Sequence, residues 1–244
     1  MIRRVMPFPP RPAVIAHRGD CAAAHENTID AFRDAIAAGA DGIELDVRRT
    51  ADARLVVHHD DAIGQSLLAR VDYQTAQALA EALGYSLPLL SEVLAVTRGR
   101  IQLDVELKEG GYEADVLALL DRAGFALDDY VVTTFDPATL LRVRAVAPTV
   151  RTGLLLEKTE WGKAFEAFRR STAHFLAPHR TMIDEPGLAA AHEQGVALVA
   201  WTVNDPAMMR RLFLAPAVTA VITDRTADAL RVRGETLARG DATR

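Results

Sequence analysis

The clearest structural signal in the chain is "GADGIELDVRRTADARLVVHHD", residues 39–60. Its first half alternates apolar and acidic residues, and this period of two predicts a β-strand over 42–47 that continues to 49. Glu44 and Asp46 then share one face of the strand. The opposite, helix-covered face carries the apolar side chains Ile43, Leu45 and Val47.

A second apolar run, residues 54–59, follows after only about five residues, whereas a parallel crossover needs about a dozen or more. The two runs therefore predict an antiparallel hairpin with "TADA", 50–53, as its turn. The second arm brings His58 and His59 back towards the end of the first strand. This geometry places an imidazole near Glu44 and Asp46.

The rest of the chain alternates apolar strand-like runs with amphipathic helical segments. Strands are predicted at 13–17, 42–47, 101–107, 130–135, 151–156, 174–178, 196–203 and 219–224. Helices are predicted at 28–39, 88–98, 112–123, 137–147, 160–170, 186–194, 206–214 and 226–233. Asn27 is the predicted N-cap of the first helix and Gly39 its C-cap. Eight βα units in 244 residues predict an α/β fold, a (β/α)8 TIM barrel, formed as a single domain over 1–244 with a short insertion at about 61–87.

Composition narrows the function classes without identifying one. The net charge of −5 argues against a nucleic-acid surface, and no run of residues is long and apolar enough to cross a membrane or anchor the chain stably. The first twelve residues lack the apolar core of a signal peptide. The single cysteine, Cys21, excludes an internal disulfide and fits a cytoplasmic location. A homo-oligomer stays open.

Acidic side chains converge on the predicted barrel interior. The alternation that places Glu44 and Asp46 inward also places Glu106 inward on "IQLDVELK", residues 101–108. Buried carboxylates are costly unless they are paired or bind a metal. Three of them at neighbouring strand ends suit Mg2+ or Ca2+. The carboxylates alone fit equally well an inward salt-bridge network whose cations are Arg18, Arg48 and Lys108.

Other polar residues follow strand ends, where the active sites of barrels are built. His17 and Arg18 end the first strand, and two imidazoles near one rim can divide the acid and base roles. Lys108, one of only three lysines, suits either a phosphate or a carboxylate counter-ion. Trp201 ends the seventh predicted strand and either walls the pocket or fills the core.

Seven motifs in order carry a resemblance to a known family. They are "AHRGD" with "HENTIDAF", "GADGIELDV", "LVVHHDD", "LPLLSEVL", "LDVELK", "WTVND" and "VITD". Over residues 13–230 the chain resembles the bacterial glycerophosphodiester phosphodiesterases. The resemblance implies a TIM barrel that uses a divalent metal, Mg2+ or Ca2+, and hydrolyses small glycerophosphodiesters to glycerol 3-phosphate and an alcohol.

The resemblance also implies a role for each matching residue. His17 and His59 would form the acid–base pair, with His59 chosen over His58 because it directly precedes Asp60. The implied metal ligands are Glu44, Asp46 and Glu106, and the implied substrate contacts are Arg18, Lys108 and Trp201.

The chain departs from the family pattern around this site. His25 stands where the family usually has proline, and "AIGQSLLARVDYQ", residues 62–74, lacks the usual Arg-Thr stretch and glycine-rich turn. These changes leave substrate choice open. One alternative is the same chemistry on a lysophospholipid or a sugar phosphodiester. Another is a catalytically idle barrel that binds a phosphorylated metabolite.

Overall fold

Eight parallel strands form a closed barrel, and a ninth, antiparallel strand extends its sheet. The computed structural model describes residues 12–241. The sheet order is β1-β11-β10-β9-β8-β7-β6-β2-β3, and pairing of β1 with β2 closes the barrel. The barrel strands are β1 (Ala13–His17), β2 (Gly42–Arg49), β6 (Gln102–Leu107), β7 (Tyr130–Thr134), β8 (Thr152–Leu156), β9 (Phe175–Pro178), β10 (Ala197–Ala200) and β11 (Val218–Thr223).

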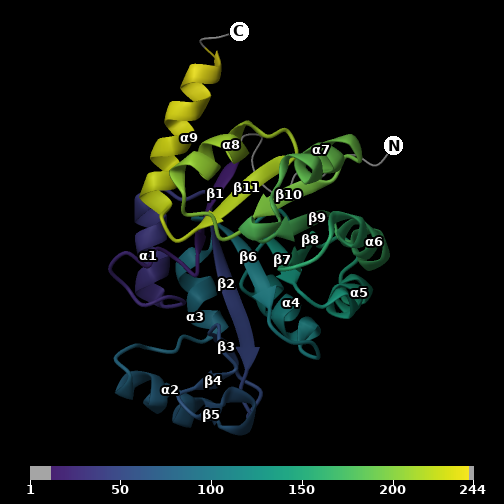
Figure 1. Cartoon of the computed structure of the whole chain (residues 1–244). Coiled ribbons are helices and arrows are strands. Elements are labelled where there is room, and N and C mark those ends of the chain that lie inside the picture. The colour runs from purple at the N-terminus through teal and green to yellow at the C-terminus, as the bar shows by residue number, and fades with distance from the viewer. Residues whose placement is uncertain (1–11, 242–244) are drawn as a thin grey trace.

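Helices surround the barrel and confirm the predicted TIM-barrel fold (Figure 1). They are α1 (Ile29–Ala38), α3 (Leu90–Thr97), α4 (Glu113–Arg122), α5 (Pro137–Val146), α6 (Trp161–Ser171), α7 (Glu185–Glu193), α8 (Pro206–Leu214) and α9 (Thr226–Asp241), with the short turn η2 (Arg180–Met182) before α7. Gly39 ends α1 with a φ of 81°, as predicted, but the N-cap is Thr28 and not Asn27, because the Thr28 hydroxyl accepts from the Ala31 amide.

The predicted hairpin is confirmed. β2 pairs antiparallel with β3 (Leu55–Val57), and Val47 lies opposite Val57. Beyond β3 the chain leaves the barrel in an insertion made of β4 (Ala62–Ile63), β5 (Ser66–Leu67), η1 (Leu68–Arg70) and α2 (Tyr73–Ala82). Figure 1 shows β2 running from the barrel towards this insertion at the lower edge of the molecule. The insertion has its own apolar cluster, formed by Val56, Ile63, Leu68, Ala76, Ala80 and Leu87.

The barrel has an apolar interior below a polar mouth. Ile15, Val131 and Phe175 belong to the cluster that fills the interior. Gly153 is required beside them, because an added Cβ would come within 2.2 Å of the Phe175 ring. As predicted, the outer face of β2 packs under the helices through Ile43, Leu45 and Val47. The polar side chains near the carboxyl ends of the strands therefore face solvent through the mouth.

Several elements differ from the sequence prediction. β10 ends at Ala200 instead of 203, because the chain turns at Trp201, which keeps one bridge to His179. α9 continues to Asp241, and the helix α2 was not predicted. Within residues 12–241, no helix has the length and apolar character needed to cross a bilayer. Residues 1–11, where a signal peptide is not expected, lie outside the described part of the chain.

Candidate active site

The three carboxylates predicted from strand alternation meet at the barrel mouth. β2 and β6 run parallel with Asp46 beside Glu106, so their inward side chains are neighbours. One oxygen from each of Glu44, Asp46 and Glu106 lies within 4.8 Å of the others, and all three residues are buried. Parallel pairing of two alternating strands is sufficient to build this cluster.

Two cations neutralise part of the cluster. Lys108 Nζ lies 2.8 Å from Glu106 Oε1 and 3.4 Å from Asp46 Oδ1. Arg18 Nε lies 3.3 Å from Asp46 Oδ2, and its Nη1 donates to Glu26 at 2.8 Å. Two of the three cations of the alternative salt-bridge network therefore contact the cluster. The third, Arg48, pairs instead with Glu109 at 2.6 Å.

The pKa values of the three carboxylates move in different directions. Burial, then the charges of Asp46 and Glu106, raise the pKa of Glu44 well above its usual range. Burial and the Asp46 charge raise the pKa of Glu106 to about 7, against the influence of Lys108. Burial alone would raise the pKa of Asp46, but Lys108 and Arg18 outweigh it and lower that pKa. Lys108 and Arg18 thus stabilise the negative charge of Asp46, but they do not offset the burial and repulsion that raise the pKa of Glu44 and Glu106.

The donor set fits a hard divalent cation. Glu44 Oε1 and Asp46 Oδ1 are buried and accept no hydrogen bond from the described residues. Carboxylate oxygens are the ligands that Mg2+ and Ca2+ prefer, and a dication would relieve the repulsion that raises the pKa of Glu44. Glu44, Asp46 and Glu106 are therefore the residues that could hold a metal.

Asn27 belongs to this site, although the sequence suggested only a helix cap. Its backbone has a φ of +57°, in the left-handed region, and its side-chain amide donates to Asp46 Oδ2 at 2.7 Å. The Asp46 backbone amide in turn donates to Asn27 Oδ1 at 3.4 Å. Asn27 thus fixes the orientation of the carboxylate that the nearby cations also hold.

His17 forms part of a hydrogen-bonded chain between three strand ends. Its Nδ1 lies 2.6 Å from Asp224 Oδ1, and Asp224 Oδ2 accepts from Asn204 Nδ2 at 2.6 Å. Its Nε2 lies 3.9 Å from Glu44 Oε2. Burial alone would raise the pKa of Asp224, but the bonds from His17 and Asn204 lower it. Asp224 therefore stays ionised and accepts a hydrogen bond from His17 Nδ1–H. This bond orients the ring so that His17 Nε2 faces the acidic cluster.

His59 reaches the same pocket from the returning arm of the hairpin. Its Nδ1 bonds Asp60 Oδ1 at 2.7 Å, and its carbonyl accepts from Arg48 Nε at 2.8 Å. Burial lowers its pKa, against the influence of Asp46. The neighbouring His58 points elsewhere, with its ring parallel to that of Tyr85 at 6.0 Å between centroids.

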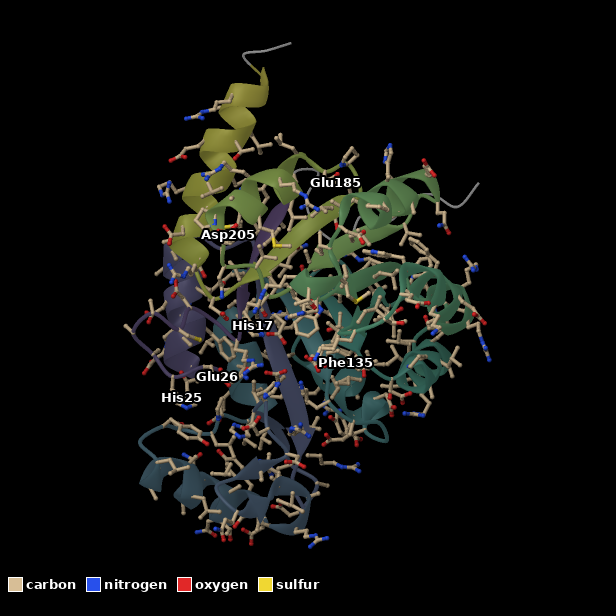
Figure 2. All side chains as sticks on the ribbon, in the orientation of Figure 1. His17, His25, Glu26, Phe135, Glu185 and Asp205 are labelled. Carbon is tan, nitrogen blue, oxygen red and sulfur yellow. The ribbon has the colours of Figure 1, made fainter. Side chains whose placement is uncertain are left out.

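These side chains surround a pocket of about 290 Å³. Its lining consists of His17, Arg18, Glu44, His59, Glu106, Lys108, Thr133, Phe135, Leu155, Glu157, Trp201 and Ile222. Trp201 thus lines the pocket, and its indole nitrogen donates to the Ala177 carbonyl at 2.7 Å. Figure 2 shows His17 and Phe135 near the centre of the molecule, with His25 and Glu26 nearer the insertion. Burial raises the pKa of the Cys21 thiol to about 12, so this residue is a poor nucleophile.

The sequence model of the glycerophosphoryl diester phosphodiesterase family matches residues 17–228, from the first histidine of the site to past Asp224. The chain belongs to this family. It is 31% identical to a glycerophosphodiester phosphodiesterase of Caldanaerobacter subterraneus subsp. tengcongensis over 232 residues, which is 86% of this chain and 93% of the relative.

Solved structures share the fold of this family member. A glycerophosphodiester phosphodiesterase from Parabacteroides distasonis aligns with a TM-score of 0.81 at 22% identity, covering 93% of this chain and 98% of the other. A phosphodiesterase from Oleispira antarctica, in complex with the product sn-glycerol-3-phosphate, aligns with a TM-score of 0.79 at 22% identity, covering 91% and 96%. These solved structures therefore share the barrel fold of this chain.

Sequence reasoning assigned no role to three polar residues of the glycerophosphodiester phosphodiesterase site. Asp224 and Asn204 follow the last two barrel strands, a position that the closed-barrel prediction already marks as facing the mouth. Glu157 follows β8 and lines the pocket without any motif to mark it. Position after a strand was the available signal, and it places Asn204 and Asp224 at strand ends, within "WTVND" and "VITD", but it assigns neither of them a role.

Proposed function

We propose that this protein is a metal-dependent phosphodiesterase that hydrolyses glycerophosphodiesters to glycerol 3-phosphate and an alcohol. The observation that carries the proposal is the convergence of two imidazoles and the buried acidic cluster on one pocket. Family membership supports the reaction class, and the product bound in the Oleispira antarctica structure supports the choice of products.

Glu44, Asp46 and Glu106 would hold the metal, which is Mg2+ or Ca2+ by the hardness of its ligands. A bound dication supplies positive charge that stabilises the developing negative charge of the phosphoryl group. Arg18 and Lys108 line the same pocket and would contact the non-bridging phosphate oxygens. Their present partners are carboxylates of the cluster, so the phosphate would join an existing ionic network.

His17 and His59 would divide the proton transfers. One removes a proton from the attacking oxygen, and the other protonates the departing alcohol. Each histidine has its Nδ1 bonded to a carboxylate, of Asp224 and Asp60 respectively. This leaves each Nε2 without a hydrogen bond to the described residues and available to substrate. Water, or the free glycerol hydroxyl of the substrate, is the attacking group.

The decisive experiment measures glycerol 3-phosphate release from glycerophosphodiesters by a coupled assay. His17→Ala and His59→Ala should each lose about 10²-fold or more in kcat, the scale of one acid–base step. The matched control His192→Ala, at an exposed position on α7, should keep wild-type activity. Exhaustive chelation should abolish turnover, and added Mg2+ or Ca2+ should restore it.

Two results would contradict the proposal. Wild-type rates in both alanine variants would remove the histidines from the mechanism, and full activity after chelation would remove the metal. Binding of diesters with no product at any metal concentration would favour an idle binding barrel.

A further inference from the structure

Arg48 contacts the backbone that carries His59, although its own side chain lies outside the pocket lining. Strand alternation places Arg48 on the same face of β2 as Glu44 and Asp46, one step beyond the acidic cluster. Its side chain is only 14% exposed. Its guanidinium bonds two other groups instead of the cluster, since Nε donates to the His59 carbonyl at 2.8 Å and Nη1 donates to Glu109 Oε2 at 2.6 Å.

The His59 backbone lies beyond the support of the hairpin. β3 ends two residues before His59, and the last backbone bond between the two arms runs from the His58 amide to the Asp46 carbonyl at 2.9 Å. Within the described part of the chain, the bond from Arg48 Nε is the only hydrogen bond that the His59 backbone makes. The imidazole adds one bond, to the largely exposed carboxylate of Asp60. Arg48 therefore fixes the peptide group from which the imidazole projects.

The second bond of Arg48 reaches the loop that begins with Lys108. Glu109 directly follows Lys108, whose backbone amide donates to the Val47 carbonyl at 3.3 Å. The planar fork of arginine offers several donors in a fixed geometry, whereas a lysine ammonium is a single point charge on a flexible stem. One guanidinium therefore sets where His59 lies relative to the Lys108 loop.

We propose that Arg48 is a positioning residue that acts by joining the peptide group of His59 to the loop after Lys108. This inference rests on the proposed function, which gives His59 its acid–base role and Lys108 its phosphate contact. Catalysis depends steeply on the placement of reacting groups, and a displacement of about 1 Å can cost about 10²-fold in rate. Without Arg48, the imidazole would stay in the pocket but would spend less time in its productive position.

The test compares kcat and KM for glycerophosphocholine hydrolysis with Mg2+ or Ca2+ added. Arg48→Met keeps the aliphatic stem and removes the donors, so kcat should fall about 10-fold, less than the loss of about 10²-fold or more expected without the imidazole. KM should change less than about twofold, because Arg48 lies outside the pocket lining. Arg48→Lys keeps the charge without the fork and should recover only part of the loss.

Arg49→Met is the matched control, on the opposite face of β2. Arg49 donates to the Gly111 carbonyl at 3.2 Å and lies over the Tyr112 ring, 5.4 Å from its centroid. It therefore also connects β2 to the loop after β6, but it makes no hydrogen bond to His59 among the described residues. Arg49→Met should keep kcat and KM close to their wild-type values.

A double-mutant cycle tests the connection to the loop. Glu109→Ala, at an exposed position, should lower kcat less than Arg48→Met does. It should lower kcat no further in the Arg48→Met background, because both substitutions break the same connection.

A further measurement does not depend on turnover. The His59 carbonyl and the Asp60 N–H belong to one planar peptide group, so the NMR order parameter of the Asp60 amide reports how firmly Arg48 holds that carbonyl. The order parameter should be about 0.85 in wild type and below about 0.6 in Arg48→Met. Arg49→Met should leave it unchanged.

The outcomes separate the positioning role from the proposed function. Wild-type kcat in Arg48→Met or Arg48→Lys, equal losses in Arg48→Met and Arg49→Met, additive losses in the cycle, or an unchanged Asp60 order parameter would overturn the positioning role and leave the phosphodiesterase intact. Failure of the metal-supplied wild type to hydrolyse any glycerophosphodiester would overturn the proposed function, and the catalytic role of Arg48 with it.

Discussion

Replacing Asp224 by asparagine should impair His17 by changing its tautomer. Asp224 accepts from two sides, from His17 Nδ1 at 2.6 Å and from Asn204 Nδ2 at 2.6 Å. The Asn204 amide is itself fixed, because its oxygen accepts from the Asp224 backbone amide at 3.0 Å. An asparagine at 224 must therefore keep its oxygen towards Asn204 and turn its NH2 group towards His17. Nδ1 then becomes an acceptor, and the proton moves to Nε2, which faces the pocket.

The expected loss in kcat is about 10²-fold, which corresponds to about 2.7 kcal/mol of transition-state stabilisation. One general acid–base step contributes about 10²–10⁴-fold. The lower end applies because the Asp224 side chain is 45% exposed, so water competes with it for His17. KM should change little, since Asp224 is not among the residues that line the pocket.

Asp60→Asn provides the matched control. Asp60 pairs with His59 Nδ1 at 2.7 Å, but its side chain is 73% exposed and accepts from no second donor within residues 12–241 that would fix its orientation. An asparagine there can rotate and present its oxygen to Nδ1, so the loss should stay below about tenfold. Steady-state kinetics on one glycerophosphodiester measures both variants. Asp224→Asn within threefold of wild type, or a larger loss in Asp60→Asn, would refute the tautomer argument.

Two further predictions concern regions outside the catalytic pair. The Tyr85 ring stacks on His25 at 4.0 Å between centroids and joins the insertion to the loop before α1. Tyr85→Ala should therefore lower the free energy of unfolding in urea by about 1 kcal/mol and should lower kcat. Tyr85→Phe keeps the ring and should restore both values, and failure of that rescue would contradict the stacking argument. His174 accepts from the Thr152 backbone amide at 3.0 Å, and burial, with the Arg144 charge, lowers its pKa. As the pH falls, the His174 imidazole of the unfolded chain therefore binds a proton before that of the folded chain, and the stability of the fold should drop below about pH 6.5. Urea midpoints of the wild type should therefore differ between about pH 7.5 and 5.5, and this difference should shrink in His174→Asn. A difference of the same size in the variant would exclude His174 as the cause.

Local patterns predicted the acidic cluster because its geometry depends only on strand alternation. Glu44 and Asp46 share a face by the period of two, and Glu106 follows from the same rule on a neighbouring parallel strand. The hairpin followed from loop length alone. These features depend on a few consecutive residues, which the sequence displays directly.

Features that depend on tertiary contacts were missed. α2 buries only Ala76 and Ala80, so its sequence lacks the wide apolar stripe that identifies a helix. Asn27 has the residue type of a cap, but its positive φ turns the side chain to Asp46, nineteen positions away. The stacking of His25 on Tyr85 joins the loop before α1 to the insertion, and neither segment predicts the other.

The pairing of His17 with Asp224 shows how the barrel itself enters the chemistry. The two residues are 207 positions apart, and they meet because β1 and β11 are adjacent in the closed sheet, with Ala16 opposite Thr223. Asn204, which holds Asp224, follows β10. The last third of the chain supplies no carboxylate to the acidic cluster, yet it orients the histidine beside that cluster. Under the proposed mechanism, hydrolysis would require closure of the barrel between its first and last strands, in addition to the carboxylates on β2 and β6.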